Sequence, residues 1–311
     1  MEMRKKIVYV LTALASASAI TYLLSRRKLR ARLAGQSQII QTSVGPVEYV
    51  DVGNGPVAVH VHGMLGGYDH WKWCEFLVNA GYRVIVPSRP GYLRTPLSSG
   101  RTPAEQAELL AGLLDLLGIE QVVLYAYSQG GTSSLEFACA YPQRCSGLIL
   151  FSALTQPQPE LSKVLPYMRF FMSQDFLLWL LKPVMLSLLM AQAKKALSKE
   201  VQQDKDQMAG LREIFEAFFQ ASLRGPGLIN DISNTVSWPG LPLERLVTPA
   251  LIIQGGKDIF VKTEESCLAA QKIPGARFLL LEDAGHEALV TCVDRIRPEI
   301  LDFLKANTPA L

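Results

Sequence analysis

A serine at position 128 stands between a run of apolar residues and a pair of glycines, in the segment VVLYAYSQGGTSSLEFA. The apolar run is typical of a buried strand, and the residues after the glycines are typical of a helix. Such a sharp turn presents a nucleophile only if the residues two before and two after it are small. Here they are Ala126 and Gly130, and the turn aims the backbone N–H of Gln129 at a developing oxyanion. We predict that Ser128 is a nucleophile, with an ordinary strand-to-helix turn as the alternative.

A serine hydroxyl needs a general base, and the base needs an acid that orients it. Asp258 follows the apolar run ALIIQ, and His286 follows the run RFLLL. Side chains beyond the carboxyl ends of parallel strands meet at one edge of the sheet. The chain order serine, aspartate, histidine is also the order of triads built on this type of turn. We therefore predict that Ser128, Asp258 and His286 form a catalytic triad. Asp258 is preferred as the acid because Asp283 is too close to His286 in the sequence.

A second glycine-rich segment, HVHGMLGG, follows another apolar run. Glycines allow the backbone to fold closely over a reactive centre. We expect the N–H of Met64 to be the second oxyanion donor beside that of Gln129, with His62 and Gly63 supporting this loop.

The same region contains four residues that loosely resemble the metal-binding pattern of metallo-β-lactamases. These residues are His60, His62, Asp69 and His70. The gap from His62 to Asp69 is several residues too long, and no further cluster of metal ligands completes a site. We therefore expect neither a metal nor another cofactor.

These motifs resemble those of the α/β-hydrolase fold superfamily, and the resemblance covers residues 38–307. The residues that carry it are His62-Gly63, Ser128 in AYSQGG, Asp258 in GGKD and His286 in AGHE. The segment SRPGYLRTPLS resembles the family's loop after the fourth strand, although Ser88 stands where an acid is common. The resemblance implies a Ser-His-Asp hydrolase with a cap that shapes the substrate pocket. Haloalkane dehalogenases and epoxide hydrolases have an aspartate at the turn, so the serine points to esterases, lipases, thioesterases, C–C bond hydrolases or peptidases.

From about residue 38 the sequence alternates apolar runs with helical patterns. The runs with strand character are IIQTS, PVEYVDVG, PVAVHVHG, YRVIVPS, QVVLYAYS, GLILFSA, PALIIQGG and ARFLLLEDAG. Strands that alternate with helices and lack a polar face indicate a parallel sheet covered on both sides. We predict an α/β fold, with a mostly parallel eight-stranded α/β-hydrolase sheet in a domain of residues 38–307.

The sixth predicted strand ends near Ser152 and the seventh begins near Ala250. A crossover helix needs only about a dozen residues. We predict that most of the surplus, residues 155–238, forms a helical cap over the carboxyl edge of the sheet. Its apolar stretch VLPYMRFFMSQDFLLWLLKPVMLSLLM contains three charged residues. A second membrane span is the alternative, which these charges and Pro183 disfavour.

The charge of the chain is unevenly distributed. Its 311 residues carry a net charge of +3, but the first 32 residues hold eight Lys/Arg and one acid. The remainder therefore has 23 basic residues against 27 acidic ones. A mildly acidic body offers no surface for nucleic acid. The odd number of five cysteines, without a C-x-x-C pair, argues against a disulfide framework.

The terminal basic clusters flank residues 7–24, an apolar stretch without charge. Eighteen helical residues span roughly 27 Å, close to the roughly 30 Å hydrocarbon core of a bilayer. We predict that residues 1–33 form an uncleaved single-pass membrane anchor and a basic linker. Five basic residues follow the stretch and three precede it, which favours a cytoplasmic catalytic domain. The alternative is export after signal cleavage, because ASASA offers small-residue cleavage sites.

These features predict a membrane-tethered serine hydrolase that cleaves a carboxylic ester through an acyl-enzyme on Ser128. The apolar cap and the anchor favour a small lipophilic substrate, such as a monoacylglycerol or a medium-chain ester. One alternative is the same serine chemistry on a thioester, a C–C bond or a peptide. The other is a catalytically silent ligand-binding protein on the same fold.

Overall fold

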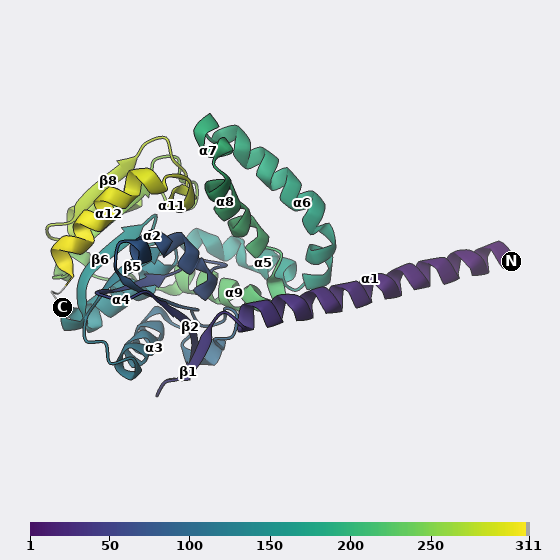
Figure 1. Ribbon diagram of the computed structural model, residues 1–311, viewed down its shortest axis with the longest axis horizontal. Helices are drawn as coiled ribbons and strands as arrows, with labels where there is room; N and C mark the ends of the chain where they lie inside the picture. Colours follow the sequence, from purple (N-terminus) through teal and green to yellow (C-terminus); the bar gives the residue numbers. More distant parts are fainter. Residues whose placement is uncertain (309–311) are drawn as a thin grey trace.

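The computed structural model describes residues 1–308 and contains an eight-stranded sheet in the order β1-β2-β4-β3-β5-β6-β7-β8 (Figure 1). The strands are β1 (Gln38–Gln41), β2 (Pro46–Val52), β3 (Val57–Val61), β4 (Arg83–Pro87), β5 (Val122–Tyr127), β6 (Cys145–Phe151), β7 (Ala250–Gly255) and β8 (Arg277–Leu281). β2 is antiparallel to β1 and β4, and the other neighbouring pairs are parallel. The predicted eight-stranded, mostly parallel sheet is confirmed.

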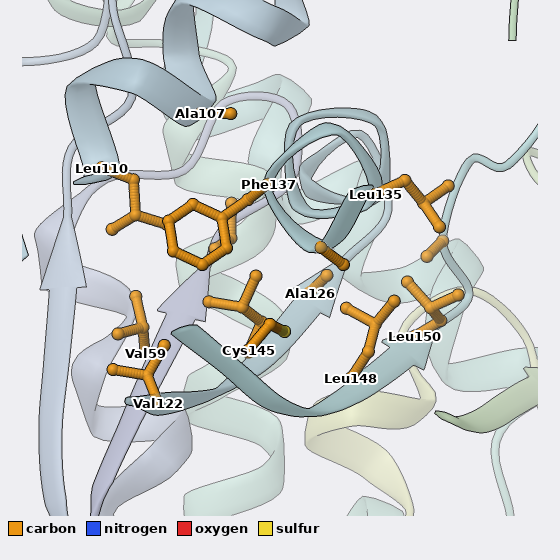
Figure 2. Packing of buried hydrophobic residues seen from close by; sticks show 14 of the residues in the cluster. Val59, Ala107, Leu110, Val122, Ala126, Leu135, Phe137, Cys145, Leu148 and Leu150 are labelled. Carbon is orange, nitrogen blue, oxygen red and sulfur yellow. The ribbon is translucent and has the colours of Figure 1, made fainter. Parts of the chain in front are cut away.

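Helices cover both faces of the sheet. One face packs against α3 (Pro103–Leu116), α4 (Gly130–Ala140) and α10 (Thr263–Lys272), and the other against α2 (Glu75–Asn79), α11 (Ala288–Thr291) and α12 (Val293–Asn307). On β5, Ala126 points to the first cluster (Figure 2), and its neighbour Tyr125 points to the second. Both faces are buried, which is why the strand sequences are apolar on both sides.

The chain between β6 and β7 consists of helices and loops. These helices are η4 (Pro159–Lys163), α5 (Leu165–Met172), α6 (Asp175–Ala196), α7 (Lys199–Gln203), α8 (Lys205–Ala217) and α9 (Ala221–Ser237). Short 3₁₀ helices in other parts of the chain are η1 (Tyr68–Cys74), η2 (Leu97–Ser99), η3 (Pro142–Arg144) and η5 (Leu243–Arg245). A separate apolar cluster joins Leu178, Leu186 and Phe219 of this segment to Leu65, which lies in the loop after β3. The helices between β6 and β7 therefore pack around a cluster of their own, which includes a residue of the loop that follows β3.

Helix α1 (Glu2–Ala34) extends from the body as a single long helix (Figure 1). Two helices among the described residues are long and apolar enough to cross a membrane: α1 and Asp175–Lys195 within α6. The basic segment after residue 24 continues α1 as helix. Within it, Arg26 is buried and pairs with Asp175 at 2.7 Å.

Candidate active site

Ser128 lies at the turn between β5 and α4 and has a φ of +53°. This left-handed conformation is strained for a residue with a Cβ atom, and the Ser128 N–H donates to the Phe151 carbonyl (3.1 Å). A Cβ at Gly130 would collide with the Val61 carbonyl oxygen, so the turn requires glycine there. The Ala126 methyl lies within the apolar cluster beside α4 (Figure 2), so alanine is compatible with the turn.

The side chains of Ser128, His286 and Asp258 form one hydrogen-bonded chain. His286 Nε2 lies 3.1 Å from Ser128 Oγ, and His286 Nδ1 lies 2.8 Å from Asp258 Oδ2. Because the carboxylate accepts the Nδ1 proton, Nε2 is left to accept the proton of the serine hydroxyl. The three residues follow β5, β7 and β8, whose carboxyl ends share one edge of the sheet. The arrangement is a hydroxyl nucleophile beside an oriented general base.

The Asp258 carboxylate is enclosed by donors. Its Oδ1 accepts the N–H groups of Phe260 (2.8 Å) and Val261 (3.0 Å). Burial alone would raise the pKa of Asp258, but the hydrogen bond and charge of His286 and the two N–H groups hold this pKa below its usual value. Asp258 is therefore an anion at neutral pH. Asp283, the other acid near this loop, is exposed and pairs with an arginine of α12.

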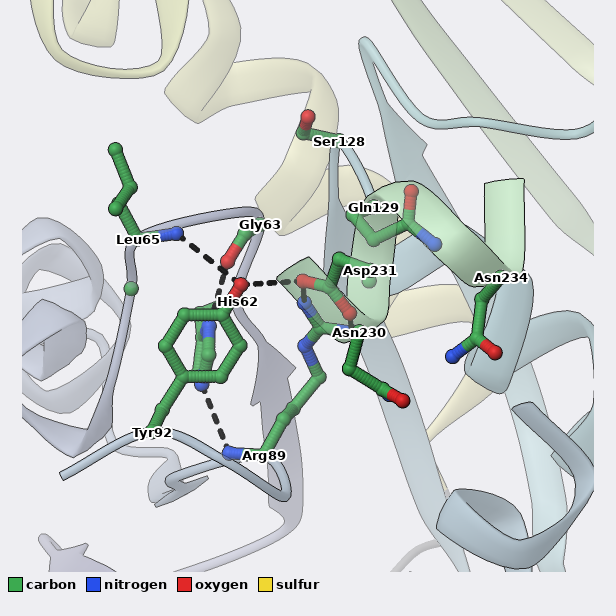
Figure 3. A network of polar contacts seen from close by, with 12 residues as sticks. His62, Gly63, Leu65, Arg89, Tyr92, Ser128, Gln129, Asn230, Asp231 and Asn234 are labelled. Atoms are coloured by element: carbon green, nitrogen blue, oxygen red, sulfur yellow. Dashed lines mark hydrogen bonds and ion pairs between the residues drawn. The ribbon is translucent and has the colours of Figure 1, made fainter. Parts of the chain in front are cut away.

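The loop after β3 lies against the nucleophile (Figure 3). A Cβ at Gly63 would come within 2.8 Å of the Ser128 Cβ, so the close approach needs a glycine. Within residues 1–308, the backbone N–H groups of Met64 and Gln129 donate no hydrogen bond. Both N–H groups therefore lack an acceptor among the described residues.

His62 supports this loop from below (Figure 3). Its Nδ1 lies 2.7 Å from the Gly63 carbonyl oxygen, and its Nε2 accepts the N–H of Arg89 at 2.9 Å. Burial and the charge of Arg89 lower the pKa of His62 well below its usual value, so the ring is neutral with its proton on Nδ1. Burial also lowers the pKa of His60 to about 4. Over the described part of the chain, no group of three or more His, Cys, Asp or Glu side chains is arranged to hold a metal.

The family model of the α/β hydrolase fold matches residues 56–291. The chain belongs to the α/β-hydrolase fold family. It is 30% identical over 272 residues to a 2-hydroxy-6-oxononadienedioate/2-hydroxy-6-oxononatrienedioate hydrolase of Paraburkholderia phymatum, a match that covers 83% of this chain and 90% of that protein. The resemblance predicted from the sequence motifs is thereby confirmed.

Solved structures of the same fold agree with this assignment. An α/β-hydrolase fold protein from Nakamurella multipartita has a TM-score of 0.70 and 32% identity, and the match covers 87% of this chain and 99% of that one. A thermophilic esterase from Thermogutta terrifontis has a TM-score of 0.68 and 25% identity, covering 88% and 100% of the two chains. Because its relatives are named as hydrolases and esterases, this member of the family is a hydrolytic enzyme.

In this α/β-hydrolase the loop after β3 is held from above by α9. The guanidinium of Arg224 is almost fully buried, and its Nη1 donates to the carbonyl oxygens of Leu65 (2.8 Å) and Gly66 (2.6 Å). Its Nη2 pairs with Asp69, at the start of η1. These bonds hold the peptide groups that follow Leu65 and Gly66, in the same loop as Met64.

A second buried contact joins α9 to the loop after β4 (Figure 3). Asp231 accepts from the Nη1 of Arg89 at 3.0 Å and from the hydroxyl of Tyr92 at 2.5 Å. The Tyr92 hydroxyl in turn accepts the N–H of Leu65 at 3.4 Å. Burial raises the pKa of Asp231, although Arg89 and Tyr92 act in the opposite direction. Asp231 is thus linked to the loop after β3, which we call the oxyanion loop, by hydrogen bonds through the Tyr92 hydroxyl.

The residue after the nucleophile is also held by α9. The hydroxyl of Thr235 donates to the side-chain oxygen of Gln129 at 2.6 Å. Arg224, Asp231 and Thr235 are spaced by seven and four residues, so they lie on one face of the helix. Our reading of the sequence missed all three, although a polar stripe at helical spacing within an apolar cap was the available signal.

A proline within α9 adds a backbone attachment. Pro226 has no N–H and disturbs the preceding helical turn. The Gly227 N–H donates to the Gly91 carbonyl at 2.9 Å, and the Leu223 carbonyl accepts the N–H of Leu93 at 2.8 Å. In a regular helix the Gly227 N–H would donate to the Leu223 carbonyl. Here both groups instead bond to the loop after β4.

Proposed function

We propose that this hydrolase cleaves a carboxylic ester through an acyl-enzyme intermediate on Ser128. The observation that carries the proposal is the hydrogen-bonded chain from Ser128 through His286 to Asp258. It lies beside two backbone N–H groups, those of Met64 and Gln129, that have no partner within residues 1–308.

The proposed reaction has two halves. Ser128 Oγ attacks the ester carbonyl while His286 Nε2 takes its proton, and the resulting oxyanion accepts the N–H groups of Met64 and Gln129. The intermediate then expels the alcohol, which receives the proton from His286. A water molecule, deprotonated by His286, attacks the acyl carbon. The bond from this carbon to Ser128 Oγ then breaks, Oγ takes the proton back from His286, and the acid is released. In both halves Asp258 keeps the imidazole oriented and stabilises its positive charge.

The surroundings of the site favour a lipophilic acyl group. Met64 and Leu65 of the oxyanion loop belong to the same apolar cluster as Met172 and Leu178 of the cap. We propose that residues 155–238 act as the cap of a hydrolase domain spanning residues 38–307, with this cluster forming the acyl-binding side of the site.

Hydrolysis of a C–C bond is the second candidate, because a relative at 30% identity is named as a hydrolase of a 2-hydroxy-6-oxononadienedioate, a compound without an ester bond. Its named substrate is a dioate, so a site for it needs cationic partners for two carboxylates. Arg224 and Arg89, the buried arginines closest to the oxyanion loop, are already paired with Asp69 and Asp231. This pairing favours the ester over the dioate.

We further propose that residues 7–24 anchor the enzyme in a membrane, with residues 1–33 as the anchoring segment and the catalytic domain on the cytoplasmic side. This proposal is supported by the length of this part of α1 and by its apolar composition without charge. Export after signal cleavage is the alternative. A mature N-terminus found just after Ala17 or Ala19 by sequencing would favour that alternative.

The nucleophile is tested with a fluorophosphonate probe and the Ser128→Ala variant. We expect the wild-type protein to be labelled and the variant to lose both labelling and essentially all turnover, by about 10⁶-fold in kcat. The matched control is Ser133→Ala, at a serine one turn further into α4, which should still label. The proposal would be rejected if the probe labelled Ser128→Ala, or if the wild-type protein showed neither labelling nor turnover.

The substrate class is tested by comparing p-nitrophenyl esters of increasing chain length with a 2-hydroxy-6-oxo-dienedioate. We expect kcat/KM to rise with chain length for the esters and to remain low for the dioate. Turnover of the dioate above that of every ester would favour C–C bond hydrolysis on the same triad.

A further inference from the structure

The cap has an exposed apolar face. On α5, Tyr167 and Phe170 are 75% and 71% exposed, and on α6, Val184 and Leu188 are 63% and 65% exposed. Further exposed apolar residues of α6 are Phe176, Leu177, Leu180 and Leu181. Leu177, Leu181, Val184 and Leu188 recur at spacings of four, three and four, so they form one stripe along the helix. We call these residues of α5 and α6 the outer cap face.

The opposite side of α6 is also apolar, but it is buried. Leu178 and Leu186 are each 2% exposed and pack in the cap cluster. A surface helix of a soluble domain normally pairs a buried apolar side with a polar outer side. α6 is apolar on both sides, so its outer side lacks the residues that water would favour.

The start of α6 is fastened to α1. Arg26 pairs with Asp175 at 2.7 Å and donates to the Phe219 carbonyl at 2.8 Å. The hydroxyl of Tyr22 donates to Asp175 at 2.6 Å, and its ring packs edge-on against Trp179 at 5.5 Å. These contacts tie the carboxyl end of the apolar stretch of α1 to the amino end of α6. α1 leaves the body beside the start of α6, and α6 continues along the edge of the cap (Figure 1).

Basic residues outnumber acidic ones in the part of the chain that forms the outer cap face. Between residues 164 and 195, Asp175 is the only acid, and it is engaged by Arg26 and Tyr22. The basic residues of this segment are Arg169, Lys182, Lys194 and Lys195, and of these Lys182 pairs with Glu216 of α8 at 3.1 Å. Basic residues beside an apolar face attract anionic lipid headgroups.

We propose that the outer cap face lies in the lipid interface of the leaflet from which α1 emerges. The inference rests on the proposed anchoring by residues 7–24. With that stretch in the hydrocarbon, Tyr22 and Trp179 lie at the level where interfacial aromatic residues are enriched. The tie between Arg26 and Asp175 then holds α6 against the same bilayer.

In this arrangement α6 lies along the membrane and does not cross it. Its inner side packs on the cap through Leu178 and Leu186, and a spanning helix would have to leave that cluster. Helices of this kind are buried about 5–10 Å into the boundary between headgroups and acyl chains. The apolar cap cluster, which includes Met64, then lies between the leaflet and Ser128. A lipid-borne ester is the substrate that such a position suits.

The proposal is tested with bimane attached to single cysteines of the full-length protein in phosphatidylcholine–phosphatidylglycerol vesicles that contain doxyl-labelled lipid. The parent replaces the cysteines that are not buried, which are Cys139, Cys267 and Cys292, by serine. Labels are placed by Val184→Cys on the outer cap face, Leu14→Cys on α1 and Leu116→Cys at an exposed apolar site of α3. Activity on a short soluble ester confirms that each labelled protein is folded.

We expect doxyl lipid to quench the labels at positions 184 and 14 strongly and the label at position 116 at background level. Quenching at 14 without quenching at 184 would overturn this inference and leave the proposed anchor intact. Absence of quenching at 14 would reject the anchor and the inference together. A label at 184 that is unquenched in vesicles but becomes shielded with rising protein concentration in detergent would assign the face to a second copy of the chain, which also overturns the inference.

A functional comparison uses the double substitution Val184→Glu with Leu188→Glu, and Leu116→Glu as its matched control. All three proteins, including the wild type, should hydrolyse a short soluble ester equally. On a long-chain ester embedded in vesicles, we expect the α6 variant alone to lose at least about fivefold in rate, because two apolar side chains that contact lipid in this arrangement are replaced by charged ones. Equal rates on the embedded ester would contradict lipid seating of the cap.

Discussion

Asp258 and Asp231 are both buried carboxylates, but the sheet edge and the cap use them differently. Asp258 accepts N–H groups from its own loop and from His286, and its pKa is held below the usual value. Asp231 lies on α9 between Arg89 and Tyr92, and burial raises its pKa. In the proposed mechanism, the first balances a charge that forms on His286 during the reaction. The second balances the permanent charge of Arg89. We therefore assign the chemistry to the sheet edge, and the positioning of the loops around it to α9.

The largest effect should come from the sheet edge. Asp258→Asn should fold normally and lose roughly 10⁴-fold in kcat, because the amide would favour the wrong tautomer of His286. Steady-state kinetics on a p-nitrophenyl ester, with thermal unfolding as a check of folding, measure this loss. Asp283→Asn is the matched control and should leave the rate unchanged. A large loss of kcat in Asp283→Asn would show that Asp283, and not Asp258, orients His286.

On the α9 side, Asp231→Asn should act mainly on stability. The substitution leaves the Arg89 guanidinium buried without a carboxylate, which typically costs about 3–5 kcal/mol in the free energy of unfolding. Chemical denaturation measures this cost. Replacing both partners, by Arg89→Met with Asp231→Leu, should recover much of it because no uncompensated charge remains. A double variant as unstable as Asp231→Asn would show that packing, and not charge, dominates at this contact.

Arg224 should act on the rate through the oxyanion loop. Arg224→Met removes the donors to the Leu65 and Gly66 carbonyls, and we expect kcat to fall by about 10²-fold, comparable to the loss of one oxyanion donor. KM for a short ester and the pH profile should change little, since Arg224 is a positioning residue. The control is Arg212→Met, on the exposed side of α8. A rise in KM with an unchanged kcat would assign Arg224 to substrate binding.

The smallest effect is expected at Thr235. Thr235→Val keeps the shape of the side chain and removes its hydrogen bond to Gln129. One neutral hydrogen bond contributes about 1 kcal/mol, so we expect a decrease of about fivefold or less in kcat. Thr235→Ser, which keeps the hydroxyl, should restore the wild-type rate. Equal losses for the valine and serine variants would point to packing of the methyl group.

The sheet and the polar residues at its edge could be predicted because their signals are local. Each strand is a short apolar run, and Ser128, Asp258 and His286 each follow such a run within a few residues. The glycine two residues after Ser128 reports the close approach of the backbone to Val61. Chain order along the sheet was then enough to predict that the three side chains meet at one edge.

The contribution of α9 could not be predicted in the same way. Arg224 contacts residues that lie 155 to 159 positions earlier in the chain, and Asp231 contacts residues 139 and 142 positions earlier. A polar residue in a helix usually faces water, and its own neighbours in the sequence do not reveal a distant partner. The burial of Arg26 was missed for the same reason, because its partner Asp175 lies in the cap.

The attachment of α9 also determines where this enzyme can be divided for engineering. A chimera that takes all of residues 155–238 from another hydrolase would remove Arg224 and Asp231, together with the backbone bonds near Pro226. A chimera that exchanges only α5–α8 would retain every contact that α9 makes with the loops after β3 and β4. The exchangeable module therefore ends between α8 and α9, and the last helix of the insertion should be inherited with the sheet.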